Sequence, residues 1–282
     1  MKELRGKAVA DAHKAVLAKK LEALAAKQVV ITLGILLVGD DKAAHMYAHF
    51  MEKTARTMGF AVDRRDLPAT ATQAEVEAVI REWNAADTIY GVLPLMPMPA
   101  QIDSEYIVDL LSPDKDLDGL TTQSIGRVIR GKRGFWPCTP RACMAILDHY
   151  DIPVAGKEVV VVGRSQVVGK PVALMLLDRN ATVTICHSRT ADLAAKLKQA
   201  DIVIAAVGKA HVIDGTMIKP GAVVIDVGIN ELDGHTVGDV NYASLDGIAS
   251  AATPVPGGVG SVTTTILLEG LCEAYYARNV DC

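Results

Sequence analysis

The 282-residue chain has few aromatic residues, no long hydrophobic run and no strong net charge. Only 4% of its residues are aromatic while 50% are hydrophobic, so we expect a core of aliphatic side chains. No apolar run reaches the roughly 18 residues of a membrane-spanning helix. A net charge of −4 lacks the basic excess that is typical of nucleic-acid-binding proteins. These absences argue against both a membrane and a nucleic-acid partner.

Cysteine pairs at metal-binding or redox spacing are also absent. No CxxC motif occurs among the five cysteines, which stand at positions 138, 143, 186, 272 and 282. Such a pattern predicts reduced thiols and a cytoplasmic location. The first 15 residues, MKELRGKAVADAHKA, are typical of a charged amphipathic helix and not of a signal peptide.

Strand and helix patterns alternate along the chain, which is typical of α/β proteins. We expect strands at 29–39, 60–66, 89–96, 159–162 and 181–186, and in the segments DIVIAAVG and AVVIDVG. We expect helices at 7–27, 40–58, 72–84 and 104–111, after Thr139, from Gly169, after Thr190 and over the last 20 residues. Capping residues mark several starts: Asp40 and Asp41, the Thr72–Glu75 capping box, Thr139 before Pro140, and Thr190.

The length is enough for two α/β domains. We expect one domain from residues 1–138 plus 262–282 and a second from residues 139–261. The second has valine-rich strands, which predict a Rossmann-type doubly wound parallel sheet.

The segment VVVVGRSQVVGKP, residues 159–171, predicts a dinucleotide-binding turn. The four valines are typical of a strand buried on both faces, Gly163 ends it, and Gly169 opens a helix. This arrangement places backbone N–H groups and a helix N-terminus against a pyrophosphate. The spacing GxSxxxGxP is one residue longer than GxGxxG, with Ser165 in the second glycine position. An ordinary strand-to-helix turn stays open as the alternative.

The end of the next strand favours NADP over NAD. An NAD site usually has an acidic residue there, which binds the ribose 2′-hydroxyl. Here residues 186–189 are Cys-His-Ser-Arg, and Ser188 and Arg189, with Arg164, suit a 2′-phosphate. The alternative is that these arginines are solvated surface charges. Gly208, after the following strand, either lets the cofactor approach the backbone or is a plain turn glycine.

Three other patterns do not predict a metal site or a catalytic thiol. His45 and His49 stand four residues apart on a predicted helix, but no third ligand is placed near them, so no metal is expected. Cys138 has no base at a readable spacing. The acidic stretch from Asp114 through Asp116 to Asp118 lacks the glutamate of a calcium loop. It is either a solvated loop or contains one ligand-binding aspartate.

Eight motifs follow one another between residues 114 and 260: DKDLDGL, PCTP, GRSQVVGKP, CHSRT, DIVIAAVGKAHVI, AVVIDVGIN, GDV and PVPGGVG. Together they resemble the methylenetetrahydrofolate dehydrogenase/methenyltetrahydrofolate cyclohydrolase family. The resemblance implies a tetrahydrofolate substrate, a nicotinamide cofactor, and two α/β domains with the active-site cleft between them. It also implies a homodimer formed through the cofactor domains.

The resemblance further implies roles for individual residues. Tyr47 would stack on the folate and Asp118 would hydrogen-bond the pterin edge. The PVPGGVG loop would line the cleft near both ligands, through Pro256, Gly257 and Gly258. Gly163, Arg164, Ser165 and the backbone near Ile229 would touch the cofactor, in addition to Gly169, Ser188, Arg189 and Gly208. Without the resemblance, Tyr47 is also explained as a core residue, because it shares a predicted apolar helix face with Phe50 and Met51.

Two positions depart from the family pattern. The family helix reads Tyr-x-x-x-Lys, with the lysine as general acid/base. Here Met51 stands four residues after Tyr47, at the position of that lysine. The family strand reads VQLPLP, with a glutamine that positions the lysine, whereas Leu95 stands there. Lys53 cannot substitute, because two residues along a helix is a rotation of about 200°. Ser261 also replaces the proline that usually follows GGVG.

These departures predict a dehydrogenase with little or no cyclohydrolase activity. Hydride transfer chiefly requires that two rings be held face to face. Ring hydration and opening require proton transfers, which Met51 and Leu95 do not supply. Three alternatives stay open: a fully bifunctional enzyme with another acid/base, a non-catalytic folate- or NADP-binding protein, and a dehydrogenase for a different substrate.

Overall fold

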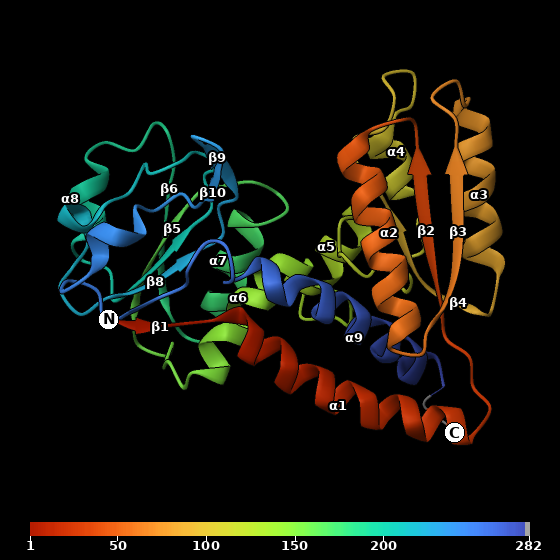
Figure 1. The fold of residues 1–282 in the computed structure, drawn as a ribbon, viewed down its shortest axis with the longest axis horizontal. Helices are drawn as coiled ribbons and strands as arrows, with labels where there is room; N and C mark the ends of the chain where they lie inside the picture. The colour runs from red at the N-terminus through yellow and green to blue at the C-terminus, as the bar shows by residue number, and fades with distance from the viewer. Residues whose placement is uncertain (280–282) are drawn as a thin grey trace. The chain divides into compact units, whose positions relative to one another are not determined.

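The computed structural model describes residues 1–279, and Figure 1 shows the course of the chain. The chain forms two compact units, the first from Met1–Ala12 with Pro137–Thr263 and the second from His13–Trp136 with Thr264–Cys282. The sequence-based division placed residues 1–12 differently. They join the first unit because β1 (Lys2–Glu3) pairs in parallel with β11 (Ala251–Ala252). Cys282 lies outside the described residues.

The second unit contains a three-stranded parallel sheet in the order β3-β2-β4. Its strands are β2 (Thr32–Val38), β3 (Ala61–Leu67) and β4 (Ile89–Pro94). Helices α2 (Lys42–Thr57) and α3 (Gln73–Ala85) cover its two faces (Figure 1). Neighbouring residues of β3 reach opposite helices, since Arg64 bonds Glu52 of α2 and Arg65 bonds Glu82 of α3. The alternation follows from the two-residue period of a strand.

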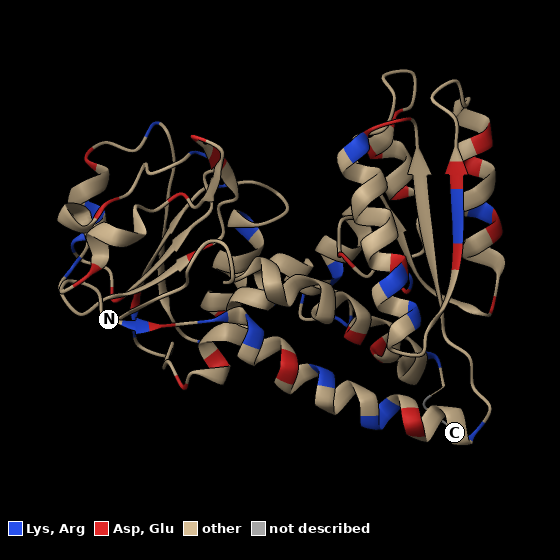
Figure 2. Ribbon diagram, in the orientation of Figure 1, with Lys and Arg blue, Asp and Glu red and all other residues tan. Residues whose placement is uncertain are grey.

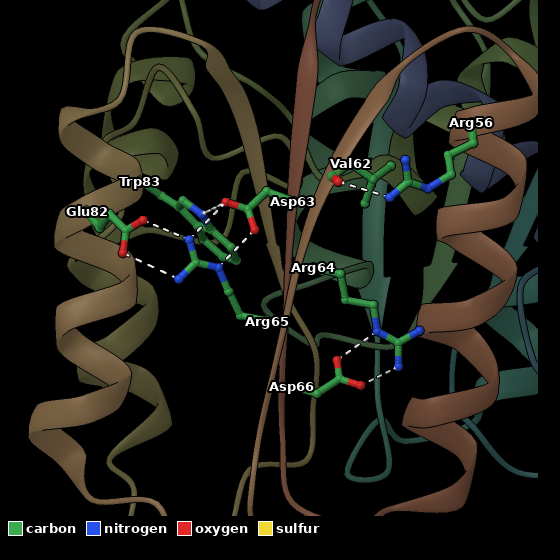
Figure 3. A network of polar contacts seen from close by, with 8 residues as sticks. All are labelled: Arg56, Val62, Asp63, Arg64, Arg65, Asp66, Glu82 and Trp83. Carbon is green, nitrogen blue, oxygen red and sulfur yellow. Dashed lines mark hydrogen bonds and ion pairs between the residues drawn. The ribbon is translucent and has the colours of Figure 1, made fainter.

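Four of the seven residues of the edge strand β3 are charged, and they colour the strand red and blue in Figure 2. Arg65 bonds both Asp63 and Glu82, and the Trp83 indole donates to Asp63 at 2.9 Å (Figure 3). The Arg65 hydrogen bond lowers the pKa of the Asp63 carboxyl. Charges of this kind protect an edge strand against pairing with another chain.

The remaining helices of the second unit include two short ones near the acidic loop. They are α4 (Ser104–Asp109) and α5 (Thr122–Ile129). The pattern did not predict α5, which begins after Thr121, whose hydroxyl accepts from Ser124 N. The long helices α1 (Gly6–Ala26) and α9 (Gly260–Arg278) contact each other through a hydrogen bond of 2.9 Å between His13 and Glu269.

The first unit contains a six-stranded parallel sheet in the order β1-β11-β8-β7-β5-β6. Its longer strands are β5 (Glu158–Val162), β6 (Thr182–Cys186), β7 (Ile202–Ala205) and β8 (Val223–Asp226). The chain leaves β5 for β6 on one side and then crosses to β7 on the other. This reversal confirms the predicted doubly wound sheet, and ligands of such sheets bind at the carboxyl ends beside the reversal.

Helices and turns connect these strands: α6 (Cys138–His149), α7 (Gly169–Asp178), α8 (Leu193–Leu197), η1 (Gly215–Met217), η2 (Tyr242–Leu245) and the hairpin β9 (Asn230–Leu232)–β10 (His235–Val237). The start of α7 is as predicted. The predicted caps of α6 and α8 are wrong, because Thr139 already lies inside α6 and Asp192 caps α8. The Thr190 hydroxyl instead accepts from His187 N. No helix within residues 1–279 is long and apolar enough to cross a membrane.

Candidate functional site

The turn after β5 brings Gly163, Ser165 and Gly169 together. Gly163 has a φ of +131°, and a Cβ there would lie 2.1 Å from the Ala206 carbonyl oxygen. A Cβ on Gly169 would lie 2.4 Å from the Gly163 carbonyl oxygen. Ser165 Oγ accepts from the N–H groups of Val168 at 3.1 Å and Gly169 at 3.3 Å. The serine hydroxyl therefore accepts from two N–H groups at the start of α7, while both glycines are required by close packing.

The turn after β6 contains the residues predicted to bind a 2′-phosphate. Ser188 and Arg189 are exposed there, as is Arg164 in the preceding turn. The turn is held by the Arg189 N–H, which donates to His187 Nδ1 at 3.2 Å. No carboxylate stands between Cys186 and Thr190, so the acidic residue of an NAD site is missing from this strand end.

The turn after β7 is held by an aspartate that sequence reasoning did not single out. Gly208 has a φ of +68°, and a Cβ there would meet nothing within 4 Å, so the turn itself favours glycine. The N–H groups of Val207, Gly208 and Lys209 all donate to the carboxylate of the buried Asp239. Asp239 belongs to the GDV motif, residues 238–240, which the sequence connects with a function only through the family resemblance.

Asp226, the last residue of β8, is a second buried aspartate that was missed. Its carboxylate accepts from the N–H groups of Gly228 at 2.9 Å, Asp239 at 3.0 Å and Val240 at 2.9 Å. Burial raises the pKa of this carboxyl to about 6, against the lowering effect of the three hydrogen bonds.

Ile229 and the PVPGGVG loop line the same hollow, which has a volume of about 200 Å³. Its lining comes from residues 226–229, Thr236 and residues 254–261. Ile229 is 71% exposed, and its side chain comes within 3.5 Å of the position of a Cβ on Gly260. The expected substrate-loop residues Pro256, Gly257 and Gly258 thus share one hollow with the end of β8.

Tyr47 and Met51 stand one helical turn apart on α2 but differ in burial. The buried residues of this helix are Ala44, Ala48, Met51 and Ala55, so its apolar face is rotated from the expected one. Tyr47 is 40% exposed and Phe50 is 53% exposed, whereas Met51 is completely buried. The interpretation of Tyr47 as a core residue is therefore wrong, while Met51 is core.

Leu95 directly follows β4 and is 5% exposed. Its N–H donates to the Leu36 carbonyl at 2.9 Å, which extends the strand pairing by one residue. Lys53, two residues after Met51, is exposed on α2. Met51 and Leu95, the two expected departures from the resembled family pattern, are thus both apolar and buried.

The acidic loop after α4 divides its carboxylates among different partners. Asp114 pairs with Arg127 at 2.8 Å. Asp116 is buried and accepts from the N–H groups of Leu120 and Thr121 at 3.1 and 2.8 Å. Asp118, the expected pterin ligand, is half-buried. Asp114 and Asp116 thus serve different structural contacts, and Asp116 fixes the backbone beside Asp118.

Lys115, in the same loop, is a buried lysine with three acceptors. Its Nζ donates to the carbonyls of Trp83 at 2.6 Å, Asn84 at 2.9 Å and Ala86 at 2.7 Å, at the end of α3. Burial lowers the pKa of this ammonium to about 8. A lysine titrating near neutrality suits acid/base chemistry. Its three protons are all directed at carbonyl oxygens, however, so it acts as a helix C-cap.

The other singled-out side chains have ordinary structural roles. His45 Nε2 lies 3.1 Å from the Gly39 carbonyl oxygen, and Cys138 is buried in α6. Among residues 1–279, no group of three His, Cys, Asp or Glu side chains is placed to hold a metal ion.

Comparison with known proteins covers both units. Residues 4–118 match the family model described as tetrahydrofolate dehydrogenase/cyclohydrolase, catalytic domain, and residues 137–279 match its NAD(P)-binding domain. The bifunctional protein FolD 2 of Geobacter metallireducens is 47% identical over 270 residues, 95% of each chain. The structure of the bifunctional enzyme FolD from Campylobacter jejuni is 37% identical, with a TM-score of 0.95 over 99% of both chains.

A further solved relative is the Trypanosoma brucei methylenetetrahydrofolate dehydrogenase-cyclohydrolase, complexed with NADP cofactor and inhibitor. It is 33% identical, with a TM-score of 0.90 over 99% of this chain and 98% of that one. Both the family models and the relatives cover nearly the whole chain. The chain therefore belongs to the tetrahydrofolate dehydrogenase/cyclohydrolase family.

Proposed function

We propose that this protein oxidises 5,10-methylenetetrahydrofolate to 5,10-methenyltetrahydrofolate with NADP and has little or no cyclohydrolase activity. Family membership supports the dehydrogenase reaction. The observation that carries the rest is an asymmetry between two sets of residues. The dinucleotide turn at residues 163–169 keeps its close-packed glycines, whereas Met51 and Leu95 are buried apolar side chains.

The oxidation makes few chemical demands on protein side chains. The methylene carbon loses a hydride to the nicotinamide ring, and the folate nitrogens share the positive charge that remains. No proton transfer is needed, so positioning supplies most of the catalysis. We assign stacking on the folate to Tyr47, whose ring is 40% exposed, and a hydrogen bond to the pterin to Asp118. Pro256, Gly257 and Gly258 would contact the ligands through the hollow that they line.

The cyclohydrolase reaction needs a group that moves protons while water adds to the methenyl carbon. Met51 has no such group, and Leu95 has no amide to orient one. Lys115 is the buried lysine of the same unit, but its Nζ is held by three carbonyl oxygens. Lys53 is exposed on α2, two positions beyond Met51. These observations favour loss of hydrolysis over a bifunctional enzyme with another acid/base.

The choice of NADP over NAD is supported by charge at two neighbouring turns. Arg164, Ser188 and Arg189 are exposed at the carboxyl ends of β5 and β6, where no carboxylate competes for the ribose. A guanidinium binds a phosphate through two parallel hydrogen bonds. The Trypanosoma brucei relative was solved with NADP.

A steady-state assay with methylenetetrahydrofolate tests this function. We expect reduction of NADP with a kcat/KM at least about tenfold above that for NAD. Replacing Arg164 and Arg189 together by alanine should remove most of this preference, while Arg179→Ala, in an ion pair with Asp148, should keep it. Binding of both ligands without any reduction would instead favour a non-catalytic relative, and activity on another substrate only would contradict the proposed substrate.

We further propose that the protein is a homodimer joined through the β6 edge of the first unit. β6 has no charged residue, in contrast to the edge strand β3. Ile185 of β6 is 42% exposed and Leu177 of α7 is 56% exposed. They line an apolar hollow of about 360 Å³ together with Ala173, Leu174, Val183 and the stem of Lys170. An uncharged, apolar edge strand favours pairing with a second copy.

A further inference from the structure

Two buried aspartates at the carboxyl edge of the parallel sheet take no part in the proposed chemistry. Asp239 is completely buried, and its carboxylate is the acceptor for four N–H donors. Three are backbone groups of residues 207–209, and the fourth is Asn230 Nδ2 at 3.0 Å. Asp239 therefore joins the turn after β7 to the segment after β8.

Both segments lie where a dinucleotide would bind. β7 pairs in parallel with β5 and β8, so all three strands end at one edge. The residue before the clamped turn, Ala206, packs on Gly163, where an added Cβ would lie 2.1 Å from its carbonyl oxygen. On the other side, a Cβ on Gly228 would lie 2.2 Å from Asp239 Oδ1. The Asp239 carboxylate thus fixes Ala206, which packs on Gly163, and the backbone of Gly228 just before Ile229.

Asp226 holds Asp239 in turn. One oxygen of Asp226 accepts from the N–H groups of Gly228 and Asp239, and the other accepts from Val240 N at 2.9 Å. Together the two carboxylates satisfy six backbone N–H groups and one side-chain amide. Leaving a buried N–H without an acceptor is costly, so the two carboxylates favour this backbone path over paths that would leave these groups unpaired.

We propose that Asp239, held by Asp226, is a positioning residue of the dinucleotide site, which fixes residues 206–209 and 228–230 against the glycine turn. This inference rests on the proposed function, since that names a dinucleotide as the ligand of this edge. A carboxylate is required because an asparagine would direct its NH2 group at N–H donors and leave some of them without an acceptor. The effect should appear in cofactor binding and not in folate binding.

The test compares Asp239→Asn with wild type and with Asp201→Asn. Asp201 lies at the opposite end of the same sheet, where it accepts from Glu158 N at 3.1 Å and Lys219 Nζ at 2.7 Å. Isothermal titration gives the Kd for NADP, and kinetics give the KM for each substrate. We expect Asp239→Asn to raise the NADP Kd about tenfold or more and to change the folate KM by less than about twofold. Asp201→Asn should leave both near wild type.

A milder variant covers the case in which Asp239→Asn does not fold. Asn230→Ala removes one donor from a half-buried side chain, and it should raise the NADP Kd about two- to fivefold. An unchanged Kd in the folded variant, or an equal loss of NADP and folate binding, would overturn the positioning role. A wild-type protein that binds NADP but oxidises no methylenetetrahydrofolate would overturn the proposed function alone, because the binding comparison would still decide the role of Asp239.

Discussion

Met51 is completely buried on α2, while Tyr47, one helical turn earlier, faces solvent. A lysine at position 51 would have to accommodate its charge at this buried position. The sequence pattern placed Tyr47 and Met51 on one apolar face, and only Met51 is buried. The error arose because Ala44, Ala48 and Ala55 carry little weight in a hydrophobic pattern although they form most of the buried stripe.

Burial of Met51 predicts that restoring the family lysine is costly. Met51→Lys should lower the free energy of unfolding by roughly 3 kcal/mol, because an unpaired charge enters the core. Met51→Leu is the matched control and should cost under about 1.5 kcal/mol, since it nearly conserves volume. Urea unfolding of both variants measures the difference. A lysine variant as stable as the leucine variant would contradict the burial argument.

Asp226 predicts a pH dependence of stability. Its pKa in the folded protein is raised from 3.8 to about 6, so the folded state binds more protons than the unfolded state between these values. The free energy of unfolding due to this group is therefore highest below about pH 4 and falls as the pH rises through about 6.

Unfolding of wild type and Asp226→Asn over this range isolates the effect. The stability of wild type relative to the variant should fall by on the order of 2 kcal/mol between about pH 4 and pH 7. Asp63, whose pKa is lowered by Arg65, should act with the opposite sign and at lower pH: the stability of wild type relative to Asp63→Asn should fall as the pH drops below the ordinary value of 3.8. A difference between wild type and Asp226→Asn that does not change with pH would contradict the raised pKa.

Local patterns predicted the elements whose signals are contained within a few residues. The Thr72–Glu75 capping box is formed as expected, with both of its hydrogen bonds. The prediction that Thr190 caps α8 was wrong because Asp192, two residues later, is the cap. The Thr190 hydroxyl instead accepts from His187 N in the preceding turn. The two-residue strand β1 has no pattern of its own, since it forms only by pairing with β11 far along the chain.

The junction of β5 and α7 gives a prediction at the scale of elements. Gly169→Ala should raise the NADP Kd about tenfold or more, because its Cβ would lie 2.4 Å from the Gly163 carbonyl and push the helix off the strand. Gly126→Ala in α5 is the matched control, since its Cβ meets nothing within 4 Å, and it should be neutral or slightly stabilising. Unaltered NADP binding in Gly169→Ala would exclude this packing role.

For the molecule as a whole, the sequence predicted the family and the doubly wound sheet, and both are confirmed. The order of the motifs was enough for the family, because each motif is short but their sequence along the chain is specific. The aspartate pair could not be predicted in the same way. Asp239 collects N–H groups from residues as far as 32 positions away, and only the fold brings them to one carboxylate.

The proposed homodimer predicts a change of molecular mass. Ile185→Asp places a charge on the apolar edge strand, and light scattering after gel filtration should then show a monomer where wild type is a dimer. Val16→Asp changes an apolar residue of α1 that is 53% exposed, and it should leave the mass unchanged. A dimer that survives Ile185→Asp would place the interface elsewhere.

The central claim is the proposal that the chain has little or no cyclohydrolase activity, and hydrolysis of methenyltetrahydrofolate tests it most directly. The purified protein, without NADP, is mixed with methenyltetrahydrofolate, and ring opening is followed beside a protein-free buffer. With Met51 and Leu95 in place of the family's lysine and glutamine, we predict the buffer rate, although the same preparation reduces NADP with methylenetetrahydrofolate. Hydrolysis well above the buffer rate and proportional to protein concentration would contradict this account.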